Sequence, residues 1–207
     1  ALATALKEND TLTELDLGVN KIGDEGAEAL ADSLKENNAL TDLDLSFNKK
    51  IGDEGVTVLA EAMLENNTLT ELDLRGNEIG VKGARALAKA LKVNDTLTEL
   101  YLGSNDIGYK GARALAKALK VNDTLTELNL NGNEIGDEGA RELAIVMKNI
   151  KLTKLSLYMN EIGDKGARAL ATALKENDTL TELDLGVNKI GDEGAEALAD
   201  SLKENNA

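Results

Sequence analysis

The residues that this chain lacks limit its chemistry before any motif is considered. Its 207 residues contain no Cys, no His and no Trp. Without Cys there is no disulfide framework, thiolate metal site or thiol nucleophile. Without His the chain also lacks the side chain most often used as an acid, a base or a metal ligand near neutral pH. We therefore expect a protein that is not an enzyme, with no catalytic residues, no cofactor and no metal site.

Positive charge is also scarce. The chain has 38 acidic and 23 basic residues, which gives a formal net charge of −15. This balance argues against nucleic acid and against an anionic membrane as partners. No apolar run approaches the roughly 18 residues of a membrane-spanning helix, and no signal peptide opens the chain. These features favour a cytoplasmic location, although Cys-free repeat proteins also occur outside cells.

What the chain does contain is one pattern, repeated seven times. Residues 12–22 read L-x-x-L-x-L-x-x-N-x-I, and the pattern returns at intervals of 28, 29, 28, 28, 27 and 28 residues. A fixed period of this length predicts a stack of similar units with one continuous core, hence a single domain over residues 1–207. The first residues of the seven units are Leu12, Leu40, Leu69, Leu97, Leu125, Leu152 and Leu180.

Each repeat changes its hydrophobic period once. Leu15 and Leu17 alternate with polar residues, as in a half-buried strand. The segment 23–26 then ends the strand and starts a helix, with Asp24 expected at or beside its N-cap. Asn20, which recurs in every repeat, is expected to satisfy backbone groups where the strand turns. The apolar stripe of the predicted helix is Ala27, Leu30, Ala31 and Leu34.

These residues resemble a known family. The segment LTELDLGVNKIGDEGAEALADSLKENN and its relatives, which cover essentially the whole chain, are similar to leucine-rich repeats of the ribonuclease-inhibitor-like class. That class also occurs in NOD-like receptors and in bacterial and algal proteins. The resemblance implies an α/β fold, a right-handed solenoid or horseshoe with a parallel β-sheet on the concave side and α-helices on the convex side. It also implies a protein-interaction module. Members that inhibit ribonucleases are rich in Cys, so that activity is not implied.

On such a solenoid, the residues beside the strand leucines line the concave face in columns about 4.8 Å apart. The columns are strongly acidic, which fits either a solvated surface or a dock for a basic protein segment. The first column is Glu14, Asp42, Glu71, Glu99, Glu127, Lys154 and Glu182. The second is Asp16, Asp44, Asp73, Tyr101, Asn129, Ser156 and Asp184.

Aromatic residues are few, and three of the four, Phe47, Tyr101 and Tyr158, are expected on strand positions that face the concavity. Such residues are enriched at interface centres. The alternatives are drift on a tolerant surface, or packing of Phe47 and Met159 into the edge of the core. The candidate partner-binding residues are Glu14, Asp16, Asp42, Asp44, Phe47, Glu71, Asp73, Arg75, Glu99, Tyr101, Glu127, Asn129, Asn131, Tyr158 and Met159.

The predicted outer helices of repeats three and four are basic, unlike their neighbours. This is expected of a solvated helical face, or of a lateral contact with the acidic concavity of another copy. The basic residues are Lys82, Arg85, Lys89, Lys92, Lys110, Arg113, Lys117 and Lys120.

The repeats are unusually alike. Residues 1–39 recur identically as 169–207, and residues 84–100 as 112–128, which suggests recent duplication or deliberate construction. The chain begins in mid-repeat without Met, as a fragment would, and neither end has an obvious polar cap. Copies that stack head to tail through these ends are therefore the alternative to a binding module. A role in GTPase activation, known for some relatives, is a further alternative that no residue here singles out.

Overall fold

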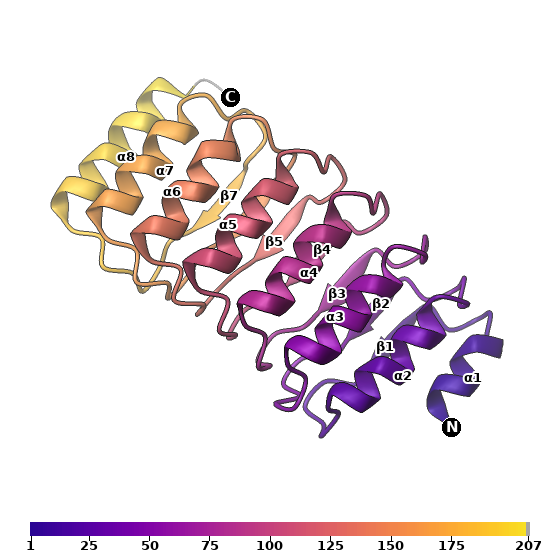
Figure 1. Ribbon diagram of the computed structural model, residues 1–207. Helices are drawn as coiled ribbons and strands as arrows, with labels where there is room; N and C mark the ends of the chain where they lie inside the picture. Colours follow the sequence, from indigo (N-terminus) through magenta and orange to yellow (C-terminus); the bar gives the residue numbers. More distant parts are fainter. Residues whose placement is uncertain (206–207) are drawn as a thin grey trace.

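Strands and helices alternate along the whole of the computed structural model, which describes residues 1–205 (Figure 1). The helices are α1 (Leu2–Glu8), α2 (Asp24–Leu34), α3 (Asp53–Ala62), α4 (Val81–Leu91), α5 (Gly108–Leu119), α6 (Gly136–Met147), α7 (Asp164–Leu174) and α8 (Asp192–Glu204). The strands are β1 (Glu14–Asp16), β2 (Asp42–Asp44), β3 (Glu71–Asp73), β4 (Glu99–Tyr101), β5 (Glu127–Asn129), β6 (Lys154–Ser156) and β7 (Glu182–Asp184).

All seven strands form one parallel sheet in the order of the sequence, which confirms the predicted solenoid. The helices lie side by side on one face of this sheet, and α1 and α8 lie at its two ends (Figure 1). Equivalent residues pair even where the repeat length changes. Asp42 pairs with Glu71 across the longer second repeat, and Glu127 pairs with Lys154 across the shorter fifth one. The inserted and missing residues are therefore absorbed in loops, and the predicted columns stay in register.

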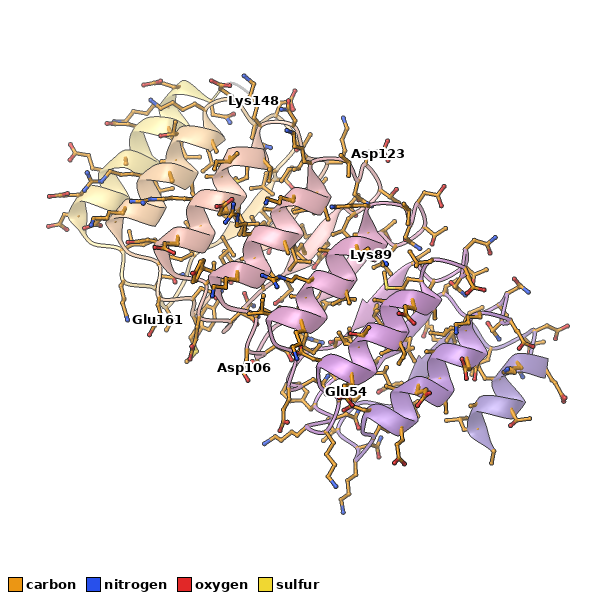
Figure 2. All side chains as sticks on the ribbon, viewed as in Figure 1. Glu54, Lys89, Asp106, Asp123, Lys148 and Glu161 are labelled. Carbon is orange, nitrogen blue, oxygen red and sulfur yellow. The ribbon has the colours of Figure 1, made fainter. Side chains whose placement is uncertain are left out.

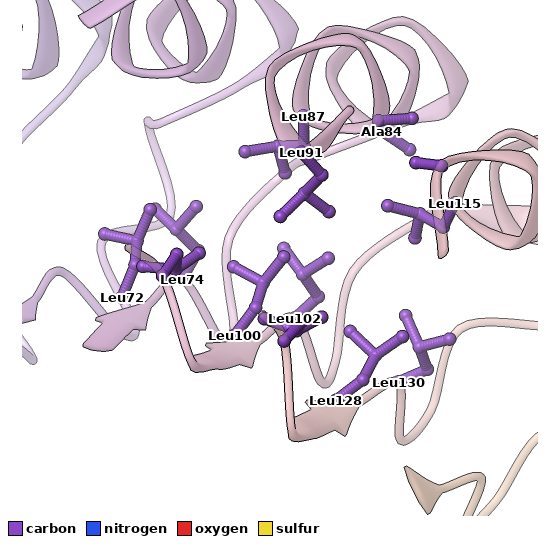
Figure 3. Close-up of a cluster of buried hydrophobic side chains, with 14 of the residues drawn as sticks. Leu72, Leu74, Ala84, Leu87, Leu91, Leu100, Leu102, Leu115, Leu128 and Leu130 are labelled. Atoms are coloured by element: carbon purple, nitrogen blue, oxygen red, sulfur yellow. The ribbon is translucent and has the colours of Figure 1, made fainter. Parts of the chain in front are cut away.

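The core lies between the sheet and the helices. In Figure 3, strand leucines such as Leu100 and Leu102 meet Leu87 and Leu91 of α4. Helix α2 buries the predicted stripe of Ala27, Leu30, Ala31 and Leu34. Each fully buried leucine contributes about 1.5–3 kcal/mol, and the alanines let the helices approach the sheet closely. No helix within residues 1–205 is long and apolar enough to cross a membrane.

The repeated Asn is structural, as predicted. Asn48 donates from Nδ2 to the carbonyl of Leu17 in the preceding repeat (2.9 Å), and its Oδ1 accepts the N–H of Ile22 (2.9 Å). The column has one gap, because Oδ1 of Asn77 is buried without a partner. The N–H of Ile51 bonds instead to the carbonyl of Asn48, beside the inserted residue (2.8 Å). The insertion therefore removes one hydrogen bond between repeats without disturbing the sheet.

The predicted position of Asp24 beside the N-cap is confirmed, and its side chain has a further role that the sequence did not reveal. The N-cap of α2 is Gly23, and Asp24 is the first helical residue, with no side-chain cap on its own helix. Its Oδ1 instead accepts the N–H groups of Gly52 and Gly55, both at 2.8 Å, at the start of α3. Each such acid therefore caps the helix of the following repeat. The same bonds join Asp53 to α4, Asp137 to α7 and Asp164 to α8.

Candidate functional site

The concave face is built by the short strands. The central leucine of each strand packs into the core, so the first and third residues of the strand project from the opposite face. The parallel register stacks them into the two predicted columns. The middle of the face is more crowded than its first strand: Glu14 and Asp16 are exposed, Glu71 and Glu99 are half-buried, and Asp73 is only 4% exposed.

A hollow of about 330 Å³ lies over the first three strands. Two leucines of the strands, six carboxylates and one cation line it, so its charge is strongly negative. The lining residues are Glu14, Leu15, Asp16, Asp42, Leu43, Asp44, Glu71, Asp73 and Arg75.

The single cation of this hollow is held in place by two neighbours. Nε of Arg75 donates to both carboxylate oxygens of Asp73, at 3.0 and 2.8 Å, and Nη2 also contacts Asp73. The guanidinium carbon lies 5.4 Å from the ring centre of Tyr101, a cation–π contact. The Tyr101 hydroxyl in turn donates to Glu99. Arg75 is therefore engaged with its own repeat and the next one, and it neutralises Asp73 rather than the first column.

The first column remains electrostatically uncompensated at its centre. Partial burial raises the pKa of Glu71 from 4.5 to about 7, with further contributions from a hydrogen bond to Asp42 and from the charges of Glu99, Asp42 and Asp73. Burial also raises the pKa of Tyr101, and its hydrogen bond to Glu99 adds to the effect. The hollow therefore holds a carboxyl group whose protonation changes near neutral pH, which the residue pattern did not reveal.

The second column has a structural task that the sequence reading missed. In four repeats an Asp of this column accepts the N–H of the residue two positions later, as Asp16 does from Gly18 (2.8 Å) and Asp44 from Ser46 (2.7 Å). Asp73 and Asp184 do the same for Arg75 and Gly186. This local bond turns the chain out of the strand, so one oxygen of each of these carboxylates is already engaged.

The predicted strand positions of Phe47 and Tyr158 are wrong. Both residues follow strands of only three residues, β2 and β6, and lie in the loops beyond them. Phe47 and Met159 have positive φ angles of 54° and 56° and are exposed at the rim. The ring of Phe47 covers Gly76, where an added Cβ would lie 2.3 Å from its Cδ1 atom. These side chains therefore border the concave face rather than standing on it.

The far half of the face differs in character. Lys154 donates to Glu127 at 2.8 Å and neutralises it. Asn131 accepts from the Ser156 hydroxyl (2.6 Å) and from the N–H of Tyr158 (2.9 Å). Ser156, absent from the predicted site, thus joins the other side chains there. The structure divides the predicted site into an acidic part on repeats one to four and a largely neutral part on repeats five and six.

The acidic side chains of this face are of the type that binds metal ions in other proteins. Within residues 1–205 no group of three or more His, Cys, Asp or Glu side chains is arranged to hold a metal ion.

Comparison with known proteins places the architecture in a family. The Leucine Rich repeat family matches residues 8–31, 36–60, 65–88, 93–116, 121–144, 148–171 and 176–199. No curated protein matches the chain. Two similar solved structures are described as Leiomodin-1 Actin-Binding Site 2 and as the Caenorhabditis elegans tropomodulin C-terminal domain. The first is 22% identical with a TM-score of 0.44 and covers 98% of this chain and 86% of its own. The second is 16% identical with a TM-score of 0.49 and covers 98% and 90%. With seven matched repeats and one parallel sheet, the chain belongs to the leucine-rich repeat family.

Proposed function

We propose that this protein is an interaction module that binds a basic protein segment in the acidic hollow over β1, β2 and β3, without catalysing a reaction. The observation that carries the proposal is the composition of the hollow, in which six carboxylates face a single guanidinium. Like charges at such spacing repel by about 1 kcal/mol in water and more where they are partly buried. A bound cation would relieve that repulsion, so the hollow favours Lys or Arg side chains of a partner.

The arrangement also supports a choice among cations. Arg75 already neutralises Asp73, and none of the other five carboxylates that line the hollow has an ion pair within residues 1–205. Among these five, Asp42 and Glu71 are joined by a hydrogen bond and form the central pair. A guanidinium from a partner could bond both of these side chains, because its donors are spread over a planar fork. The leucines that line the hollow offer apolar contact to the stem of the partner's side chain. We therefore expect Arg to bind more tightly than Lys.

A defined probe tests the proposal. A short labelled oligoarginine peptide should bind the protein at low salt and should lose affinity steeply as salt rises. Replacing the carboxyl pair, Asp42→Asn with Glu71→Gln, should weaken binding about tenfold or more, which corresponds to about 1.4 kcal/mol. The matched control, Glu28→Gln with Glu54→Gln, changes the net charge equally on the outer helices and should leave most of the affinity. Equal losses in both double variants would contradict a localised site.

The titration of Glu71 gives the same site a pH signature. Since a cation prefers the ionised carboxylate, peptide affinity should rise as pH increases through about 7, and Glu71→Gln should abolish that rise. The free energy of unfolding should change in the opposite direction and fall as pH rises. The folded chain holds the Glu71 proton more tightly than the unfolded chain, so the associated stabilisation is complete below pH 4.5 and is lost as pH rises to about 7. Chemical denaturation at pH 5 and at pH 8 measures this difference, and an identical pH dependence in Glu71→Gln would contradict the assignment.

End-to-end association of copies is the second candidate. Apolar hollows lie at both ends, about 220 Å³ beside Leu2 and Leu17 and about 300 Å³ beside Leu183 and Leu202. However, joining β7 of one copy to β1 of another would place α8 and α1 in the same layer, so α1 would have to move away. Sedimentation velocity over a range of protein concentrations tests this arrangement, and a constant monomer mass would contradict it.

A further inference from the structure

The convex side carries a second charged surface, which the proposed function does not use. Helix α4 with its C-cap presents Lys82, Arg85, Lys89 and Lys92, and neither it nor α5 contains an acidic residue. All four side chains are exposed, and Lys89 is seen on the outer side of α4 in Figure 2. Helix α5 with its C-cap repeats the arrangement with Lys110, Arg113, Lys117 and Lys120. We call these eight side chains the basic ridge.

The basic ridge is unusual because most of its charges have no ion pair. Within residues 1–205, Arg113 is the one member with an ion pair, to Glu142 at 3.2 Å. Cations on the other helices and at their ends commonly have partners, as in Lys7 with Glu36 (2.7 Å) and Lys35 with Asp32 (3.2 Å). A chain with a net charge of −15 has ample acid to neutralise such a ridge. Seven of the eight ridge cations on these two adjacent helices therefore have no ion pair within residues 1–205, which sets them apart from the other helices.

The same two helices also depart from the capping pattern of the fold. Val81 and Tyr109 occupy the positions at which Asp24 and Asp53 cap the following helix. An Asp at either position would place a carboxylate directly beside Lys82 or Lys110. Without an Asp at these positions, the ridge is purely cationic, and the helix of the following repeat loses its cap. Giving up a stabilising contact in this way is expected of a functional surface.

The ends of these helices add an apolar component. Val93 and Val121 directly follow the last lysines and are 66% and 61% exposed. A further hollow of about 90 Å³ lies between α3 and α4, and its lining combines apolar side chains such as Leu64 with the charged Glu61 and Lys89. Cations beside exposed apolar side chains match a partner that offers carboxylates and apolar groups together.

The surroundings of the ridge limit the size of that partner. Asp95 and Asp123 follow the two valines, and α3 and α6 on either side carry Glu54 and Glu138. A long polyanion such as nucleic acid would run over these acids, and it would make no use of Val93 or Val121. We propose that the basic ridge of α4 and α5 is a second interaction surface, which binds a short acidic protein segment with interspersed apolar side chains. It is separate from the concave site and does not depend on it.

Direct binding of a defined peptide tests this surface. The probe is a short labelled helical peptide with Glu and Leu on one face, and it should bind at low salt and weaken as salt rises. Lys89→Glu with Lys117→Glu should weaken binding about tenfold or more, and Lys89→Gln with Lys117→Gln should have a smaller effect of the same sign. The control, Lys151→Glu with Lys165→Glu, reverses two exposed cations outside the ridge and should change affinity less than about threefold.

Three results would overturn the proposal. One is equal weakening by the ridge and control variants, and another is no binding of the peptide at any salt concentration. The third is tighter binding of a single-stranded oligonucleotide, or of vesicles containing phosphatidylserine, than of the peptide. Circular dichroism of each variant shows whether it is folded. The concave double variant, Asp42→Asn with Glu71→Gln, should retain the acidic peptide, so failure of one site does not imply failure of the other.

Discussion

Helices α3, α4, α7 and α8 begin in one way, and helices α5 and α6 begin in another. In the first group an Asp of the preceding repeat accepts two backbone N–H groups, and the N-cap glycine is extended, with φ of −109° at Gly52 and −99° at Gly80. In the second group the equivalent position of the preceding repeat holds Val81 or Tyr109 instead of Asp. There the helix starts one residue earlier, and the glycines Gly108 and Gly136 adopt φ of +57° and +60°.

The difference shows that a loop can take its conformation from a neighbouring repeat. Without a carboxylate to bond, the N–H of Gly108 turns to the carbonyl of Asn133 (2.9 Å), and that of Gly136 turns to Asn160 (2.8 Å). These bonds need a left-handed residue, which glycine adopts without steric penalty. The segments I-G-D-E-G at 51–55 and at 135–139 are identical, yet they fold differently. From α3 onward, the extended start occurs where an Asp stands about 28 positions earlier, and the left-handed start occurs where Val81 or Tyr109 stands there, whereas α2 has the extended start at Gly23 without such an Asp.

Removing one cap should have the largest effect. Asp53→Ala deletes the acceptor of the Gly80 and Gly83 N–H groups, at 2.9 and 2.7 Å, and should lower the free energy of unfolding by about 1–2 kcal/mol. The control is Asp192→Ala, the same residue type in α8, for which residues 1–205 contain no following helix. Urea denaturation measures both variants, and equal losses would show that the inter-repeat bonds contribute little.

The next largest effect should be a difference in stability between alanine substitutions at a left-handed glycine and at an extended one. Gly136→Ala forces a Cβ into the left-handed region and should destabilise the protein by about 1 kcal/mol, although no atom lies within 4 Å of the added Cβ. Gly52→Ala adds a Cβ 3.7 Å from its nearest neighbour at an ordinary φ, and should change stability by less than about 0.5 kcal/mol. Thermal unfolding of the pair checks the comparison, which fails if both alanines are tolerated equally.

Restoring an Asp at the capping position should return Gly136 to the extended conformation, with a smaller change in the free energy of unfolding. Tyr109→Asp supplies a carboxylate to Gly136 and Gly139 and should stabilise the protein by about 0.5–1 kcal/mol. In that background Gly136→Ala should become nearly neutral, because Gly136 would move to the extended conformation. A double-mutant cycle measures this coupling. Independent, additive effects of the two substitutions would mean that Tyr109 does not set the conformation of the loop.

The repeat pattern predicted most of the architecture, because hydrophobic periods report which residues face the core. Strand order, the columns and the helical stripe all follow from the spacing of leucines such as Leu15 and Leu43. The direction of the Asp24 side chain did not follow, since a local pattern identifies a helix start but not which neighbouring helix comes within reach. The loop position of Phe47 was missed because the Asp44 side chain ends the strand early.

Electrostatic detail in the candidate site was the least predictable. That Glu71 is acidic and central could be read from the columns, but its raised pKa depends on partial burial and on the distance to Asp42. The pairing of Arg75 with Asp73 likewise depends on side-chain conformations that spacing does not specify. The acidic character of the surface was thus predictable, whereas its division into neutralised and uncompensated parts was not.

The two kinds of inter-repeat bond run in opposite directions along the chain. Carboxylates such as Asp24 reach forward to the next helix, while amides reach backward, as Asn48 does to Leu17 and Asn37 does to Leu6. Internal units whose preceding repeat supplies the Asp are therefore completed from both sides, whereas α5 and α6 lack the forward bond. Shortening the array from its N-terminal side would strip a cap from a helix, whereas shortening it from the C-terminal side would strip donors from carbonyl groups. The solenoid thus has a polarity, and deletions at its two ends should damage different bonds.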